Sequence, residues 1–82
     1  MKDNKKEWLL MYNEEKEEAR EFLEKYENYG IVQNTLTTIK NKNLLHSDRW
    51  SIVYGMIDEA FPQYIRTKVV TGIVYLVEEG EI

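Results

Sequence analysis

The sequence has no cysteine, one histidine and one proline among its 82 residues. Without cysteine no disulfide can hold a small fold together, and a structural zinc site, which draws on cysteine and histidine, is excluded. The four glycines lie at positions 30, 55, 72 and 80, too far apart for a glycine-rich phosphate loop or a dinucleotide fingerprint. We therefore predict no cofactor and no metal site.

Long hydrophobic runs are also missing. The longest mainly apolar stretch, residues 69–77, is interrupted by Thr71 and Gly72, whereas a membrane-spanning helix needs about 20 residues. The apolar run that follows the first lysines, residues 8–12, is too short for the core of a signal peptide. We expect a cytoplasmic protein that makes no membrane contact.

The residues that are present suffice for one folded domain. Hydrophobic residues make up 43% of the chain and aromatic residues 12%, whereas disordered chains have low hydrophobicity and few aromatic residues. Two separate cores would leave each piece below roughly 40 residues, where disulfides or metals are usually needed. We predict a single helical domain over residues 1–82, with disordered ends at 1–4 and 79–82.

The first third of the sequence has the pattern of one long helix, over residues 4–28. Apolar and aromatic residues recur at alternating spacings of four and three, which places them on one helix face with Glu15 as the polar exception: Trp8, Tyr12, Ala19, Phe22, Tyr26 and Tyr29. Asp3 or Asn4 would cap its start, and Gly30 would end it in a left-handed conformation. A short coiled-coil seam has the same spacing, but these rings are too bulky for ordinary knobs-into-holes packing. We expect the helix to pack on its own domain.

A second helix is predicted over residues 34–40 and a third over residues 48–61. Asn34 is a suitable N-cap for the second, and residues 40–43 form a polar loop after it. Ser47 or Asp48 would cap the third, and Pro62 marks its end, because the residue before a proline is pushed out of helical geometry. The apolar residues of the third helix share one face: Trp50, Val53, Tyr54, Ile57, Ala60 and Phe61. Gly55 in its interior indicates either close packing of another backbone segment or a tolerated loss of stability.

Residues 63–79 are open to two interpretations. Ile65, Val69, Ile73, Leu76 and Val77 lie on one side of a helix that Gly80 would end. Many of the same residues are strand formers, and residues 67–77 with residues 31–39 would give an α+β fold with a sheet of two or three strands. Two strands make a poor sheet in a domain this small. We therefore predict an all-α fold, a small bundle of about four helices.

His46, Ser47 and Asp48 are the residue types of a hydrolytic triad. A triad places the imidazole between the hydroxyl and the carboxylate, which consecutive residues cannot normally do. A helix cap explains Ser47 and Asp48 better. We predict no catalytic residues and a protein that is not an enzyme.

Acidic residues outnumber basic ones, and the formal net charge is −4. Residues 1–29 carry a net −3 and residues 78–82 another −3, whereas residues 30–77 carry +2. In the first helix the acids recur at helical spacing: Glu14, Glu17, Glu18, Glu21, Glu24 and Glu27. Lys16, Arg20 and Lys25 interrupt this row, which has the simple explanation of a solvated helix face. The same row also imitates the phosphates of a nucleic acid.

The charge pattern and the lack of catalytic motifs favour a non-enzymatic protein-binding module. A basic nucleic-acid-handling host protein is the partner that an acidic helix face would fit. We predict that the partner-binding residues are four acids of the outer helix side with two aromatic anchors: Glu14, Glu17, Glu21, Glu24, Tyr26 and Tyr29. Abundant Lys, Glu, Asn, Ile and Tyr with only two alanines is a usage common in AT-rich genomes, which suggests a small phage, mobile-element or bacterial regulatory protein.

Two alternative functions remain at this stage. One is a small helix-turn-helix-like DNA-binding regulator, with residues 34–43 or 48–61 as the reading helix, although a net charge of −4 counts against phosphate binding. The other is a self-assembling structural subunit such as a homodimer, because a core in this size class often contributes only about 3–5 kcal/mol and association would bury more surface.

Overall fold

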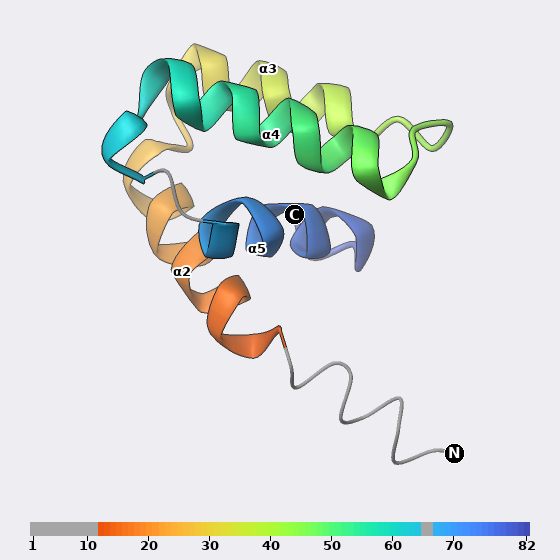
Figure 1. Cartoon of the computed structure of the whole chain (residues 1–82), viewed down its shortest axis with the longest axis horizontal. Helices are drawn as coiled ribbons and strands as arrows, with labels where there is room; N and C mark the ends of the chain where they lie inside the picture. The colour runs from red at the N-terminus through yellow and green to blue at the C-terminus, as the bar shows by residue number, and fades with distance from the viewer. Residues whose placement is uncertain (1–11, 65–66) are drawn as a thin grey trace.

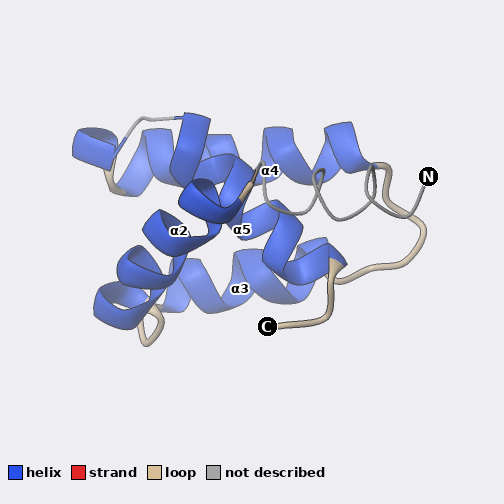
Figure 2. Cartoon of the chain, turned by 90° about the horizontal axis from the view of Figure 1, so that it is seen from below, coloured by secondary structure: helices blue, strands red, loops and turns tan. Residues whose placement is uncertain are grey.

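The computed structural model describes residues 12–64 and 67–82. In these ranges the chain forms four α-helices and a short 3-10 helix, with no strand (Figure 2). The elements are α2 (Asn13–Tyr26), α3 (Gly30–Ile39), α4 (His46–Ala60), η1 (Pro62–Tyr64) and α5 (Thr67–Glu78). The predicted all-α bundle is confirmed. The alternative sheet is wrong, because residues 31–39 and 67–77 are both helical.

The helices form two crossing pairs. α3 and α4 lie side by side as an antiparallel hairpin, and α5 runs beneath them and packs on α2 (Figure 1). α5 is the central helix, and Val70, Ile73, Val74 and Leu76 in it have no exposed surface. A helix that is buried on several sides is apolar nearly all round. This explains why residues 67–77 also have the composition of a buried strand.

α5 packs closely against the backbone of α2 at Gly72. A Cβ atom at Gly72 would lie 2.6 Å from the carbonyl carbon of Glu15 and 2.8 Å from the Cβ of Ala19. At Gly55 a Cβ would meet nothing within 4 Å. Close backbone packing at Gly55 is therefore the wrong alternative, and Gly72 is the glycine on which the packing depends.

The predicted end of the last helix is confirmed, whereas that of the first helix is wrong. Gly80 has φ +78°, and the N–H groups of Gly80 and Glu81 donate to the carbonyls of Val77 (3.1 Å) and Leu76 (2.9 Å). This is the Schellman pattern, in which a left-handed glycine closes a helix. Gly30 instead begins α3, because the chain leaves α2 through a right-handed Glu27 and restarts after an extended residue 29.

The predicted starts of two helices are also corrected. α3 begins at Gly30, so Asn34 lies inside it, where the Asn34 carbonyl accepts a hydrogen bond from the Thr38 hydroxyl. α4 begins at His46, and the Asp48 carboxylate reaches back to accept from the Leu45 N–H at 3.3 Å. A carboxylate at the third helical position stabilises the start from inside the helix. One unbroken helix over residues 4–28 is wrong, because α2 spans only Asn13–Tyr26 and Tyr12, its N-cap residue, has non-helical backbone angles. Residues 4–11 lie outside the described residues.

Other boundaries agree with the sequence pattern. The predicted loop residues 40–43 are not helical and belong to the connection 40–45 between α3 and α4, and α4 ends at Ala60, two residues before Pro62. On the predicted inner face of α4, Val53, Ile57 and Phe61 are buried, but Ala60 is exposed. Within the described residues, no helix has both the length and the apolar character needed to cross a bilayer.

Candidate functional site

α2 brings the four predicted acidic contact residues together. At 100° per residue, Glu14, Glu17, Glu21 and Glu24 fall within a sector of about 80° around the helix, and all four are exposed. The opposite side of α2 carries the buried Ala19 and Phe22, packed against the rest of the core. Ala19 and Phe22 of the predicted stripe therefore pack on their own domain, and the acids share the outer side. Trp8 of the stripe lies outside the described residues.

The acids at the start of α2 already have cationic partners. Glu14 forms an ion pair with Lys68 of α5, and the same ammonium lies 3.9 Å from Glu18. The hydrogen bond to Glu14 raises the pKa of Lys68. Glu17 accepts from Arg20 at 3.2 Å. The first half of the acidic row is thus partly neutralised within the molecule.

The acids at the end of α2 differ in this respect. The exposed side chains of Glu21, Glu24 and Glu27 make no ion pair or hydrogen bond with any described residue. Lys25 is the one base among them and is exposed too. We call Glu21, Glu24 and Glu27 the unpaired acidic surface. Negative charge without an internal partner is therefore concentrated at one end of the predicted site.

Two of the three bases that interrupt the acidic row of α2 form ion pairs with glutamates near the C-terminus. Lys16 donates to Glu79 at 2.7 Å, and its side chain is only 7% exposed. Arg20 donates to Glu81 at 2.8 Å, which lowers the pKa of Glu81. The prediction that Lys16 lies on the solvated side of the helix is wrong, because its stem is covered and its charge meets a carboxylate beside the core. Disorder of residues 79–82 stays a prediction, although Glu79 and Glu81 both contact α2.

The two predicted aromatic anchors have different environments. Tyr26 is half-buried, with its ring centroid 4.7 Å from that of Phe61 and its hydroxyl 3.4 Å from that of Tyr64. The hydrogen bond to Tyr64 and burial raise the pKa of Tyr26. Tyr29 is 53% exposed and contacts Tyr26 with its ring edge at a centroid distance of 5.4 Å. Tyr26 is thus part of the internal packing, whereas Tyr29 is available at the surface beside the unpaired acidic surface.

A hollow of about 290 Å³ lies next to these acids, between α2 and α3. Its lining is two leucines with polar and aliphatic residues around them: Arg20, Leu23, Glu24, Glu27, Gln33, Leu36 and Ile82. Sequence reasoning did not find this site, because its lining comes from α2, α3 and the last residue of the chain. The one local signal in the sequence is Leu23, an apolar residue directly after Phe22 of the predicted stripe. We call this feature the α2–α3 hollow.

Comparison with known proteins adds no assignment. No protein-family model, curated protein or solved structure matches this chain. Among residues 12–64 and 67–82, no group of three or more His, Asp or Glu side chains is arranged to hold a metal ion. The function has to be argued from the geometry of the chain itself.

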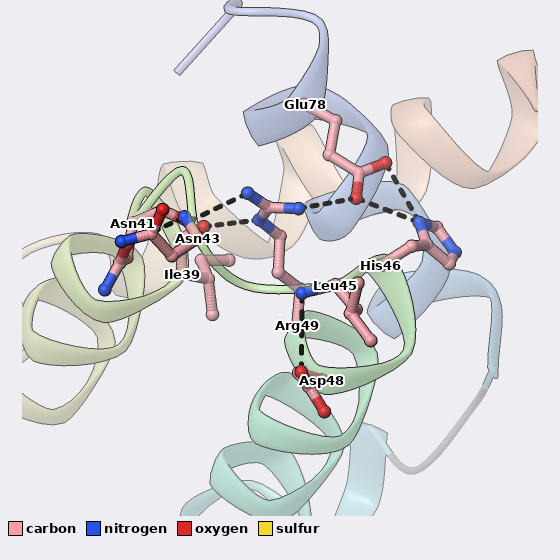
Figure 3. Close-up of polar contacts among 8 residues, drawn as sticks. All are labelled: Ile39, Asn41, Asn43, Leu45, His46, Asp48, Arg49 and Glu78. Atoms are coloured by element: carbon pink, nitrogen blue, oxygen red, sulfur yellow. Dashed lines mark hydrogen bonds and ion pairs between the residues drawn. The ribbon is translucent and has the colours of Figure 1, made fainter.

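His46 belongs to a polar cluster that joins three helices (Figure 3). The His46 Nδ1 lies 2.9 Å from both carboxylate oxygens of Glu78, at the end of α5. Arg49 donates to the same carboxylate at 3.2 Å and to the carbonyls of Ile39 (2.7 Å) and Asn41 (2.9 Å). Arg49 therefore satisfies the carbonyl of Ile39, the last residue of α3, which the helix itself leaves unpaired, and adds a second donor to the loop carbonyl of Asn41, which also accepts from the Leu44 N–H. The cluster is structural, and in the described residues no hydrogen bond links His46, Ser47 and Asp48 to one another.

Proposed function

We propose that this protein is a non-enzymatic binding module that docks on a basic surface of another protein through the end of α2. The observation that carries this proposal is that Glu21, Glu24 and Glu27 have no ion pair with any residue in 12–64 or 67–82, beside acids that are neutralised. A cationic partner can meet these three carboxylates without breaking an ion pair within the described part of the chain. Exposed charge of one sign also speeds the encounter with a surface of opposite sign.

The exposed Tyr29 supports the same location for the contact. An aromatic ring with a polar tip suits a half-solvated interface, and tyrosine is enriched among residues that dominate binding energy. Tyr29 lies between α2 and α3, as the N-cap residue of α3, and its ring contacts those of Tyr26 and Phe61. A ring that is already held in place loses little conformational freedom on binding.

The partner class that we propose is a basic, nucleic-acid-handling protein in the cytoplasm. Carboxylates repeated along one helix side imitate a row of phosphates, which such a protein is built to bind. The amino-acid usage is that of AT-rich genomes, which supports a small phage, mobile-element or bacterial regulatory protein. Direct DNA binding has less support, because Arg49 and Lys68 are both occupied by carboxylates of this chain.

The test is a pair of charge-reversal variants with the same change in net charge. Glu21→Lys with Glu24→Lys alters the proposed contact surface, and Asp58→Lys with Glu59→Lys alters exposed acids at the end of α4. Each pair takes the formal net charge from −4 to 0. Full-length wild type and both variants are immobilised and exposed to a bacterial lysate, and circular dichroism checks that helix content is unchanged.

The proposal expects a partner that wild type and the α4 variant retain and the α2 variant loses. The partner should elute between low salt and about 1 M salt, where the screening length is about 3 Å. If the α2 variant retains the same partner as the α4 variant, the α2 surface is not the contact. If retention is independent of salt, charge complementarity is not the basis of binding.

A further inference from the structure

The α2–α3 hollow adjoins the unpaired acidic surface and shares Glu24 and Glu27 with it. Its volume of about 290 Å³ is just below the range of roughly 300–1,000 Å³ in which pockets enclose a cofactor or a drug-sized molecule. A hollow of this size that opens on the surface accommodates one or two side chains of a partner protein.

The lining of the hollow favours an aliphatic side chain. Leu23 and Leu36 line it from α2 and α3, and Ile82 lies at the same hollow and is 36% exposed. The side-chain amide of Gln33 already donates to the backbone carbonyl of Glu27. The open acceptors of the lining are the carboxylates of Glu24 and Glu27, which are exposed and which water also reaches. An aliphatic side chain would in addition remove apolar surface at Leu23 and Leu36 from water.

The charges around the hollow indicate which partner residues would flank that aliphatic side chain. Arg20 is the one cation of the lining, and it is engaged by Glu17 and Glu81 at 3.2 and 2.8 Å. Glu24 and Glu27 have no such partner among the described residues. The uncompensated charge at the rim is therefore negative, and it complements lysine or arginine.

From this we infer that the α2–α3 hollow receives an aliphatic side chain flanked by lysine or arginine residues on the partner protein. The inference rests on the proposed function and makes it more specific, because it states which feature of a basic surface is recognised. Positive charge alone would bind the unpaired acidic surface, and the aliphatic side chain adds contact with Leu23 and Leu36.

Three capped synthetic peptides test the inference on the isotope-labelled full chain by NMR titration at low salt. They are Lys-Lys-Leu-Lys-Lys, Lys-Lys-Ser-Lys-Lys and Glu-Glu-Leu-Glu-Glu. The leucine-lysine peptide should shift the amide signals of Leu23, Gln33 and Leu36. The serine peptide should bind at least about tenfold more weakly, since burying a leucine side chain is worth about 1.5 kcal/mol or more and 1.4 kcal/mol is a factor of ten in affinity. The glutamate peptide should not bind.

A pair of tryptophan variants locates the binding. Gln33→Trp fills the hollow from α3, whereas Asn34→Trp places the same ring at the next exposed position, outside the lining. Gln33→Trp should reduce binding of the leucine-lysine peptide to the level of the serine peptide, and Asn34→Trp should leave it unchanged. Circular dichroism confirms the fold of both, and the peptide comparison on wild type stands even if one variant fails to fold.

The outcomes separate this inference from the proposed function. Equal affinity of the leucine-lysine and serine peptides, with shifts confined to Glu21 and Glu24, would overturn the inference and leave acidic docking supported. Unchanged peptide binding by Gln33→Trp would also overturn it. If neither lysine peptide binds at low salt, both the inference and the proposed docking surface fail.

Discussion

At the scale of single residues, the fold depends most visibly on the absence of a side chain at Gly72. The atoms that a Cβ would meet are the backbone of Glu15 and the fully buried Ala19. A flexible side chain can swing away from such a contact, but a helix backbone cannot, so α2 and α5 would have to separate. Gly55 is the opposite case, an exposed glycine in the interior of α4 with open space around it.

We predict opposite effects for alanine at these two glycines. Gly72→Ala should lower the free energy of unfolding by about 2 kcal/mol or more, because overpacking commonly costs about 1–3 kcal/mol and here the obstacle is backbone. Gly55→Ala should raise it by about 1 kcal/mol, the difference in helix propensity. Urea denaturation followed by circular dichroism measures both. A neutral Gly72→Ala would mean that α2 and α5 do not cross as closely as described.

Tyr75 is the residue whose titration should be visible in stability. Its ring stacks on that of Tyr12 at a centroid distance of 4.2 Å, and burial together with a hydrogen bond with Tyr12 raises its pKa to about 12. The unfolded chain loses this proton near pH 10. The folded state therefore binds the proton more tightly than the unfolded chain. The contribution of protonated Tyr75 to the free energy of unfolding is fully present below pH 10 and is lost as the pH rises toward 12.

We predict that Tyr75→Phe flattens this part of the pH profile. Wild type should lose stability more steeply than the variant between pH 10 and 12, because the variant has no phenol at position 75 to titrate. Thermal unfolding at a series of alkaline pH values gives the comparison, and tyrosinate absorbance of the folded proteins gives the titration directly. Identical alkaline profiles would show that Tyr75 ionises equally in both states.

At the scale of helices, the sequence predicts which segments are helical better than where each one begins. The periodic apolar faces of α2, α4 and α5 are local properties, and the structure confirms them as helices. Starts and ends depend on contacts that the spacing does not contain. Asp48 caps α4 from inside the helix, and Arg49 completes the end of α3 from the next helix.

The pairing of Lys16 with Glu79 shows how α2 is attached to the end of α5. The Lys16 side chain is 7% exposed and that of Glu79 is 24% exposed, so the two partners are desolvated to different degrees. Removing the carboxylate leaves a covered ammonium without its partner. Removing the ammonium leaves a carboxylate that water can still reach.

We therefore predict an asymmetric response to the two substitutions. Glu79→Gln should lower the free energy of unfolding by about 1–3 kcal/mol, the cost of a covered charge that loses its charged hydrogen bond. Lys16→Met should cost less, since its methylenes keep the packing of the lysine stem. Denaturation of both single variants and the double variant gives the coupling energy. Equal costs for the two single changes would contradict the unequal burial.

At the scale of the whole molecule, the two acidic ends of the sequence have separate roles. Glu78, Glu79 and Glu81 all pair with bases of the chain, namely His46 and Arg49, Lys16, and Arg20. The contacts of Glu79 and Glu81 engage Lys16 and Arg20 of α2, and no described residue pairs with Glu21, Glu24 or Glu27. Spacing alone predicts that the acids of α2 share a side. Spacing does not predict which of these acids are unpaired, because the carboxylates that engage Lys16 and Arg20 instead, those of Glu79 and Glu81, lie about 60 positions away in the sequence.

From its position, Glu27 is expected to lower the stability of the fold and to strengthen binding of a basic partner. Glu27 directly follows α2, where the helix dipole is negative, and Glu24 lies one turn before it. The negative end of the helix dipole and the charge of Glu24 both disfavour a carboxylate at position 27. Glu27→Gln should therefore raise the free energy of unfolding by about 0.3–1 kcal/mol. The melting temperature should rise by a few degrees in a domain of this size. The same change removes a rim charge of the α2–α3 hollow, so the leucine-lysine peptide should bind more weakly.

Glu14→Gln is the matched control at the other end of α2. Glu14 stands in the first turn, where the dipole favours a negative charge, and it pairs with Lys68. Its replacement should therefore lower stability slightly and leave binding of the peptide unchanged. Differential scanning calorimetry and the NMR titration measure the two quantities on the same samples. A Glu27 variant that is more stable and binds less would mean that this carboxylate is kept at a cost to the fold, as expected for a contact residue; unchanged binding would make it an ordinary surface charge.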